Sequence, residues 1–160
     1  MVKLGGIEMS SRLEQFVQSF SWVENKNIPW AQMQKPLCES RIALISTGGI
    51  YVFGDEPFSV VSRSDVDESY REIPLHCEAD KLRIAHEHYD KRHAAEDLNV
   101  VFPLERLRQL AAEGFLGELA DVHFSISGYI PKPDKLYQSG LEIAERLKTM
   151  RVDAALLVPV

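Results

Sequence analysis

Residues 41–50 read Arg-Ile-Ala-Leu-Ile-Ser-Thr-Gly-Gly-Ile, in which an almost continuous apolar run over 41–46 stops at a threonine and two glycines. Runs of this kind are typical of strands that are buried on both faces, as in a parallel sheet. Open parallel sheets bind their ligands beyond the carboxyl ends of the strands, where the next loop begins. This run therefore predicts the fold class and also the place where a site is expected.

The segments on either side of this run alternate between strand and helix patterns. A helix is expected to open at Pro103 and to end at Gly114, because proline suits the first turn and glycine suits the residue after the last. Apolar spacing predicts a longer helix over about 134–150 and an isolated amphipathic helix over 10–20. Short extended segments are expected at 70–75, 81–88, 123–127 and 154–158.

Strands separated by helices indicate an α/β fold. We expect a mainly parallel sheet flanked by helices, a Rossmann-like layered sandwich, with an N-terminal helix in front of it. The length of 160 residues matches one domain. Residues 1–40 are expected to hold the N-terminal helix and an irregular connection, and residues 41–160 to form the α/β domain.

The composition argues against several functional classes. Eighteen basic and 24 acidic residues give a net charge of −6, so no basic stripe is available to bind nucleic acid. The apolar runs fall far short of the ~20 residues that cross a bilayer, and no signal-peptide core is recognised, so we expect a cytoplasmic protein without a membrane partner. Cys38 and Cys77 lack metal-ligand spacing and are expected to be reduced and structural.

Gly48 and Gly49 form the first candidate site. A glycine pair that follows a buried strand can present backbone N–H groups to a phosphate or a carboxylate. The pair lacks the complete spacing of a nucleotide-binding loop, and glycine pairs are also common in ordinary turns. From the residues alone, both interpretations stay open.

His86, His88 and Asp90 form the second candidate site, with His93 close by. In an extended segment over 81–88, His86 and His88 project from the same face, so that both imidazoles would meet one ion or one substrate. Asp90 would then orient an imidazole by accepting its second N–H. The structural alternative is a polar strand end that makes capping and loop hydrogen bonds.

Several motifs occur together in the order found in one known family. Besides residues 41–50 and 86–90, they are Asp-Leu-Asn-Val-Val-Phe-Pro-Leu-Glu-Arg-Leu at 97–107, Ser-Gly-Tyr-Ile-Pro at 127–131 and Val-Asp-Ala-Ala-Leu-Leu-Val-Pro-Val at 152–160. The set resembles the selenoprotein B component of glycine, sarcosine and betaine reductase, and especially the D-proline reductase branch. On this resemblance, residues 41–160 are the N-terminal part of a longer family domain.

The resemblance implies reductive cleavage of a C–N bond in an amino acid or a derivative, with electrons from a dithiol donor. In the family, the strand that matches 154–160 is followed at once by selenocysteine or cysteine. The resemblance therefore implies that the chain stops just before its nucleophile, and that neither Cys38 nor Cys77 replaces it. No catalytic residue, cofactor or metal is assigned within these 160 residues.

The same resemblance implies a substrate-binding crevice beside the expected nucleophile. It is lined by Gly48, Gly49, His86, His88 and Asp90, which would bind the substrate carboxylate or supply a proton to the leaving amine. The implied partners are a small amine or amino acid substrate, a partner reductase subunit and a thioredoxin-like donor. We also expect a homo-oligomer.

Two other functions stay open. One is a non-catalytic binding or scaffold subunit of the same fold that is complete at Val160. The other is a metal-dependent enzyme built on His86, His88 and Asp90. An in-frame UGA codon after codon 160 distinguishes the reductase from the scaffold, and metal analysis tests the third function.

Overall fold

The computed structural model describes residues 3–4, 7–8, 11–20, 26, 28–29, 31–59, 67–128, 130 and 132–160. The chain divides into two compact units, Met1–Gln32 and Met33–Val160. In the first unit, β1 (Lys3–Leu4) pairs antiparallel with β2 (Ile7–Glu8), and α1 (Ser11–Ser19) follows. The structure thus confirms the N-terminal helix. Tyr129 and Pro131 of the Ser-Gly-Tyr-Ile-Pro motif lie outside the described residues.

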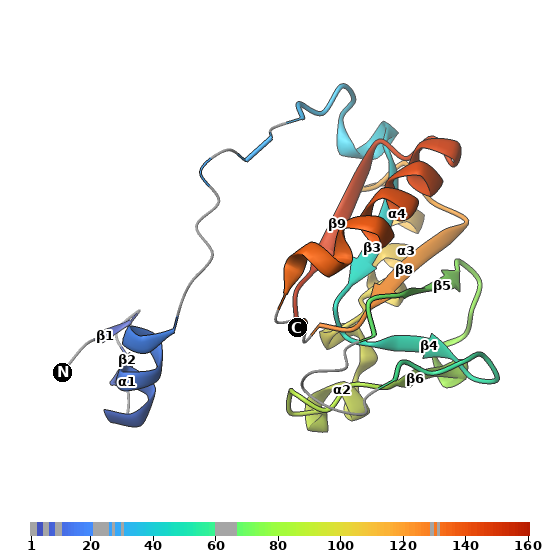
Figure 1. Ribbon diagram of the computed structural model, residues 1–160. Coiled ribbons are helices and arrows are strands. Elements are labelled where there is room, and N and C mark those ends of the chain that lie inside the picture. The colour runs from blue at the N-terminus through green and yellow to red at the C-terminus, as the bar shows by residue number, and fades with distance from the viewer. Residues whose placement is uncertain are drawn as a thin grey trace. The chain divides into compact units, whose positions relative to one another are not determined.

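The second unit is built on a mainly parallel sheet, which confirms the α/β class (Figure 1). Its central strand is β3 (Arg41–Ser46), the apolar run of the sequence. On one side, β3 pairs along its length with parallel β9 (Ala154–Val158), from Ile42 opposite Ala154 to Ser46 opposite Val158. On the other side it pairs with parallel β7 (Glu118–Leu119) and β8 (Val122–Ile126). The antiparallel strand β5 (Tyr70–Pro74) extends the sheet beyond β8.

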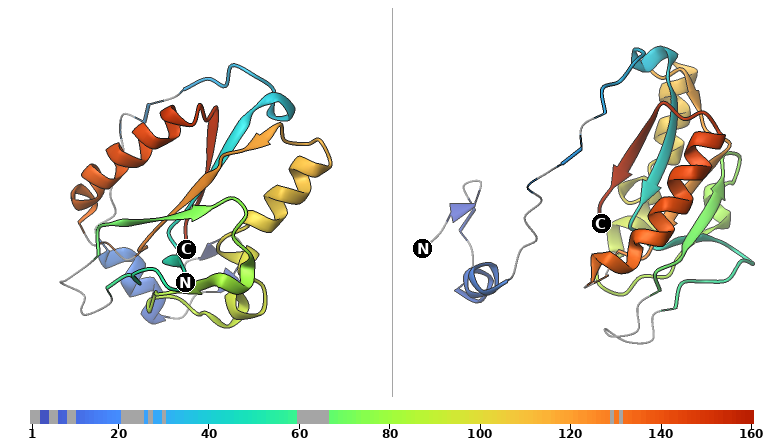
Figure 2. Two further views of the ribbon diagram at one scale, coloured as in Figure 1. Left: turned by 90° about the vertical axis from the view of Figure 1, so that its right-hand side faces the viewer. Right: turned by 45° about the horizontal axis from the view of Figure 1, so that its top comes forward.

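Helices cover both faces of this sheet, as the two views of Figure 2 show. The helix α3 (Leu104–Ala112) follows Pro103, and Gly114 has a positive φ of 78° just after it, so both predicted boundary residues are in place. On the opposite face, the 3-10 turn η4 (Pro133–Leu136) leads into α4 (Tyr137–Thr149). Together they account for the helix predicted over 134–150.

A small antiparallel sheet lies at the carboxyl end of the large one. It consists of β4 (Ile50–Val52) and β6 (Leu82–Ile84), and it is followed by the short helix α2 (Arg92–Glu96). The prediction of an extended segment over 81–88 is therefore wrong in its second half, because β6 ends at Ile84. Three 3-10 turns complete the unit: η1 (Leu37–Glu39), η2 (Ala79–Lys81) and η3 (Leu98–Val100).

Residues 33–40 belong to the same compact unit as the sheet. The N–H of Gly117 donates to the carbonyl oxygen of Leu37 at 2.9 Å, and the N–H of Glu118 donates to that of Ser40 at 3.0 Å. Gly117 is required there, because a Cβ atom would lie 2.8 Å from the backbone of Ser40.

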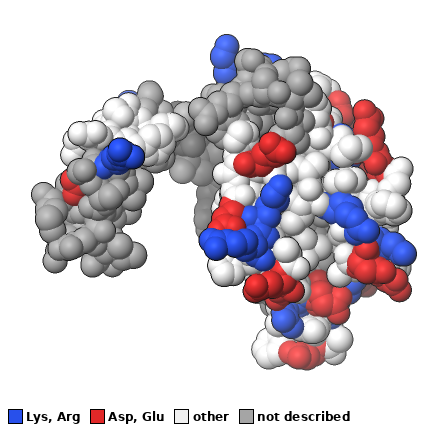
Figure 3. Space-filling view, turned by 90° about the horizontal axis from the view of Figure 1, so that it is seen from below, with Lys and Arg blue, Asp and Glu red and all other residues white. Residues whose placement is uncertain are grey.

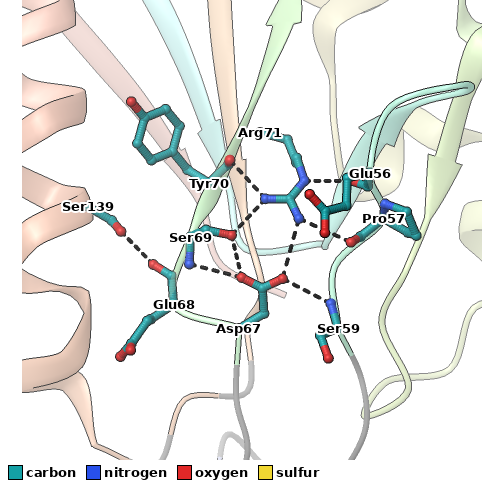
Figure 4. A network of polar contacts seen from close by, with 9 residues as sticks. All are labelled: Glu56, Pro57, Ser59, Asp67, Glu68, Ser69, Tyr70, Arg71 and Ser139. Atoms are coloured by element: carbon teal, nitrogen blue, oxygen red, sulfur yellow. Dashed lines mark hydrogen bonds and ion pairs between the residues drawn. The ribbon is translucent and has the colours of Figure 1, made fainter.

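Arg71 links β5 to the preceding loop through hydrogen bonds (Figure 4). Its guanidinium donates to the carbonyl oxygens of Glu56 at 2.7 Å and Pro57 at 3.1 Å, and it lies 4.3 Å from the ring centroid of Phe58. The carboxylate of Asp67 stands 3.4 Å from the guanidinium, and both side chains are largely shielded from solvent. Arg71 thus joins two segments that the sequence separates.

The surface of the sheet unit carries both charge signs. On the face shown in Figure 3, basic and acidic side chains are interspersed rather than gathered by sign. Among the described residues, no helix has the length and apolar character needed to span a membrane.

Candidate functional site

The turn after β3 forms the wall of a site at the carboxyl edge of the sheet. Gly49 has a φ of 66°, and a Cβ atom there would lie 2.6 Å from the carbonyl oxygen of Ala85. Only glycine fits that position without strain. A Cβ atom on Gly48 would meet Ser46 Oγ at 3.2 Å and Val101 Cβ at 3.4 Å. Both glycines are buried, so the turn packs closely against the loop that follows β6.

The backbone donors of this turn are already used inside the protein. The N–H of Gly48 donates to Ser46 Oγ at 3.0 Å, and the N–H of Gly49 donates to the carbonyl oxygen of Ile126 at 3.1 Å. The next N–H, that of Ile50, donates to Ser125 Oγ at 2.7 Å. The structure therefore favours the ordinary turn for this glycine pair over an anion cradle made of its N–H groups.

Thr47 joins the end of β9 to the same turn. Its N–H donates to the carbonyl oxygen of Val158 at 3.0 Å, and its Oγ1 accepts the N–H of Val160 at 2.8 Å. Gly128, just after β8, completes the junction, because a Cβ atom there would lie 2.5 Å from the carbonyl oxygen of Thr47. The carboxyl ends of β3, β8 and β9 therefore meet at one place.

His86 lies next to this junction, against Gly128. The residue is only 3% exposed, and its Nδ1 accepts the backbone N–H of His88 at 3.1 Å. Its ring lies 4.7 Å from that of Tyr89, whose hydroxyl donates to the carbonyl oxygen of Gly48 at 3.2 Å. A Cβ atom on Gly128 would come within 3.0 Å of His86 Nε2, which is buried and has no hydrogen-bond partner.

Burial sets the protonation state of this pair of rings. Burial lowers the pKa of His86, and electrostatic interactions with His88 and Lys91 lower that pKa further. Burial also raises the pKa of Tyr89. Both side chains are therefore neutral at neutral pH.

His88 and Asp90 differ from the arrangement that an extended segment would give. His88 is exposed, and its ring centroid is 5.9 Å from that of His86, because the chain turns after β6 to let the N–H of His88 reach His86 Nδ1. The carboxylate of Asp90 accepts from Arg92 Nε at 2.9 Å and from the backbone N–H of Arg92 at 3.1 Å. These hydrogen bonds lower the pKa of Asp90. Its observed partner is thus Arg92, not an imidazole.

The proposed metal centre receives no support from this arrangement. Within the described ranges, no group of three or more His, Cys, Asp and Glu side chains is placed to hold a metal ion. One nitrogen of His86 is already occupied as an acceptor, which leaves only Nε2 for any ligand.

Sequence reasoning missed Thr47, Tyr89 and Gly128 as members of this site. Tyr89 lies within the 86–90 motif, and Gly128 lies within the Ser-Gly-Tyr-Ile-Pro motif, so both carried a signal. Thr47 carried none beyond its place at the end of the apolar run. Its role depends on the pairing of β3 with β9, which brings Val160 to it.

Comparison with known proteins identifies the family. Residues 9–160 match the model of the glycine/sarcosine/betaine reductase selenoprotein B family. The chain belongs to this family. The family resemblance found in the sequence motifs is thereby confirmed. No solved structure matches the chain.

Curated relatives agree with this assignment. The D-proline reductase subunit gamma of Acetoanaerobium sticklandii is 32% identical over 129 residues, which cover 80% of this chain and 52% of the relative. The glycine reductase complex component B subunit gamma of Symbiobacterium thermophilum is 32% identical over 124 residues, or 77% of this chain and 29% of the relative. The sarcosine reductase complex component B subunit beta of Peptoclostridium acidaminophilum is 29% identical over 117 residues, which cover 72% of this chain and 27% of the relative. The chain thus spans about half the length of the first relative and under a third of the other two.

Proposed function

We propose that this chain is part of a reductase subunit that cleaves the C–N bond of an amino acid or an amino acid derivative. Its family and the names of its relatives, which are D-proline, glycine and sarcosine reductase subunits, support this proposal. In the reaction, the C–N bond takes up two electrons and two protons and is replaced by a C–H and an N–H bond. The electrons come from a dithiol donor, whose two thiols are oxidised to a disulfide.

One hydrogen bond carries the proposal, the 2.8 Å contact from the N–H of Val160 to Thr47 Oγ1. It holds the end of β9 beside the turn at Gly48 and, across Gly128, beside His86. We propose that a selenocysteine or cysteine follows Val160 in the full subunit and reaches the substrate from this point. A selenol ionises more readily than an ordinary thiol of pKa ~8.5, so a selenocysteine there supplies an anionic nucleophile at neutral pH.

In this proposal the substrate binds at the same junction. Gly48 and Gly49 form its wall, His86 binds the substrate from within the protein, and the exposed His88 and Asp90 contact it from the solvent side. The subunit works with a partner reductase subunit and a thioredoxin-like donor, and it forms homo-oligomers.

The test is an assay of the native complex that contains this chain. D-proline, glycine, sarcosine and betaine are offered in turn with dithiothreitol as the dithiol donor, and the amine or ring-opened product is quantified. We expect one substrate to be consumed, with dithiol oxidation equal to C–N cleavage and loss of activity after alkylation of the reduced enzyme. An intact complex that consumes none of them would reject the reductase and favour the binding or scaffold subunit.

A further inference from the structure

We propose that His86 is a neutral hydrogen-bond donor that binds a carboxylate oxygen of the substrate through Nε2–H, at the junction of β3, β8 and β9. The inference rests on the proposed function, because it assumes that this junction is the substrate site. It assigns to one residue a specific role, that of a donor which holds the substrate and does not transfer a proton to it.

The surroundings of Nδ1 fix the tautomer of His86. Nδ1 lies 3.1 Å from the backbone nitrogen of His88 and accepts its N–H. A nitrogen that accepts a hydrogen bond carries no hydrogen, so the neutral ring must carry its hydrogen on Nε2. Protonation to imidazolium would place a second hydrogen on Nδ1, directly against the N–H of His88. The contact with His88 therefore selects the neutral Nε2–H form by geometry.

Nε2 is an unpaired donor close to the protein surface. The whole residue is 3% exposed, and Nε2 has no hydrogen-bond partner. Gly128 lies against this nitrogen and is itself exposed. Leaving a buried donor unpaired is unfavourable, so an acceptor that reaches Nε2 gains a hydrogen bond which the protein alone does not supply. A Cβ atom at position 128 would lie 3.0 Å from Nε2 and 2.5 Å from the carbonyl oxygen of Thr47. The exposed Gly128 therefore covers Nε2 with backbone alone, and the ligand oxygen of this proposal reaches Nε2 beside that backbone.

The chemistry of this donor selects the class of ligand. Nε2–H repels cations and requires an acceptor, and the nearby positive charge of Lys91, which helps to lower the pKa of His86, favours an anion. A phosphate would need several converging donors, but the N–H groups of Gly48, Gly49 and Ile50 donate within the protein. One directional donor matches one oxygen of a carboxylate.

The test combines histidine NMR with a simple probe. The full chain is labelled with ¹⁵N in histidine, and its ring tautomers are recorded at neutral pH while sodium acetate is added. We expect His86 to show the Nε2–H tautomer and its Nε2 signal to shift in a saturable manner. His123 serves as an internal control, because its Nδ1 also accepts a backbone N–H, that of Leu44, but it is fully buried within the sheet. Its signal is expected to stay unchanged.

Two variants of His86 and one control variant test whether acetate binds at His86. We expect His86→Leu to weaken acetate binding by ~10-fold or more, which corresponds to ~1.4 kcal/mol. His86→Gln, which retains a side-chain N–H donor, is expected to recover part of this loss, whereas His93→Gln, at an exposed position, is expected to change nothing. Binding is followed on backbone amide signals, so that the variants remain comparable.

The proposal is overturned by an Nδ1–H tautomer, by an imidazolium at neutral pH, or by a His86 signal that does not respond to acetate. None of these readouts needs turnover. A complex that reduces its substrate while acetate leaves His86 unchanged would retain the proposed function and reject this inference. Acetate binding at His86 in a complex without reductase activity would support this inference and reject the proposed function.

Discussion

At the scale of single residues, His86 and His123 share one hydrogen-bonding pattern in two different surroundings. Both accept a backbone N–H at Nδ1, and both have a buried Nε2 without a partner. His123 is fully buried in the sheet, and its burial, together with the charge of Arg108, lowers its pKa to about 4. His86 stands at the edge of the sheet beside an exposed glycine. We therefore expect His123 to affect stability, and the proposed binding concerns His86 alone.

His123 makes the stability of the protein depend on pH. Between pH 6.5 and about 4, the unfolded histidine is protonated and the folded one is not. The unfolded chain then binds more protons, so the free energy of unfolding falls as the pH falls, by about 3 kcal/mol at most. His86 acts in the same direction. Urea unfolding across this pH range measures the slope.

The matched variants for this prediction are His123→Gln and His93→Gln. The first replaces the titrating ring with a side chain that offers Leu44 another acceptor, so its stability is expected to depend less on pH. The second lies at an exposed position and should keep the slope of the wild type. An unchanged slope in His123→Gln would show that another group causes the pH dependence.

Gly128 and Gly140 form a second matched pair. A Cβ atom at Gly128 would lie 2.5 Å from the carbonyl oxygen of Thr47, whereas at Gly140, within α4, nothing lies within 4 Å. We expect Gly128→Ala to lower the free energy of unfolding by about 1–3 kcal/mol. Gly140→Ala is expected to raise it by roughly 0.5–1 kcal/mol, because alanine favours the helix. Equal effects in urea unfolding would contradict the packing at the junction.

At the scale of the elements, Arg71 links β5 to Glu56 and Pro57 in the preceding loop. Arg71→Ala removes hydrogen bonds to Glu56 and Pro57 and leaves Asp67 without its cation. We expect a loss of about 2–3 kcal/mol in the free energy of unfolding, because the charged side chain of Arg71 makes these hydrogen bonds and is itself largely shielded from solvent. Arg92→Ala is the control, since Arg92 pairs with Asp90 at the solvent-exposed surface and should not change stability measurably. A loss of the same size in both variants would refute the role of Arg71.

The elements that the sequence predicted correctly are those whose pattern is local. The strand β3 is a continuous apolar run, and α3 has boundary residues of its own, so neither depends on distant contacts. The short strands β4 and β7 were missed, because two or three residues carry no periodicity and pair only when distant strands are present. The strand β6 was predicted too long, because alternation of apolar residues and histidines continues past Ile84 while the backbone turns.

The sequence indicated candidate residue types for the site but not their contacts. The density of ligand-type side chains at 86–90 singled out His86, which the structure places against the turn at Gly49. The contacts of His88 and Asp90 could not be predicted from residue types. The backbone N–H of His88 competes for Nδ1 of His86, and Arg92 competes for the carboxylate of Asp90. Such competition is decided by local geometry, which spacing does not encode.

At the scale of the whole molecule, an apolar groove lies between α4 and the sheet. Its volume is about 410 Å³, and its lining is almost entirely apolar, with Ile45, Ile126, Ile143, Leu147 and Leu157 among its residues. Leu157, in the edge strand β9, is 67% exposed. Strands of parallel sheets are normally covered on both faces, so this groove is a surface that favours association.

We therefore predict that the 160-residue chain self-associates through this groove. Leu157→Asn is expected to lower the average mass in sedimentation at the same protein concentration, without a large loss of stability, because the side chain is mostly exposed. Phe115→Asn, at a side chain that is 65% exposed but does not line the groove, is the control and should leave the mass unchanged. A wild-type chain that stays monomeric at all concentrations would contradict the prediction.

Our main proposal is that the residue after Val160 in the full subunit lies at the junction beside His86. Its most direct test is the mass of the tryptic peptide that begins at Val152 in the native protein, since Arg151 is the last cleavage site before the end of β9. We expect a peptide that continues beyond Val160, with selenocysteine or cysteine as the next residue. A native peptide that ends at Val160, from a gene that closes there with a stop codon other than UGA, would contradict it.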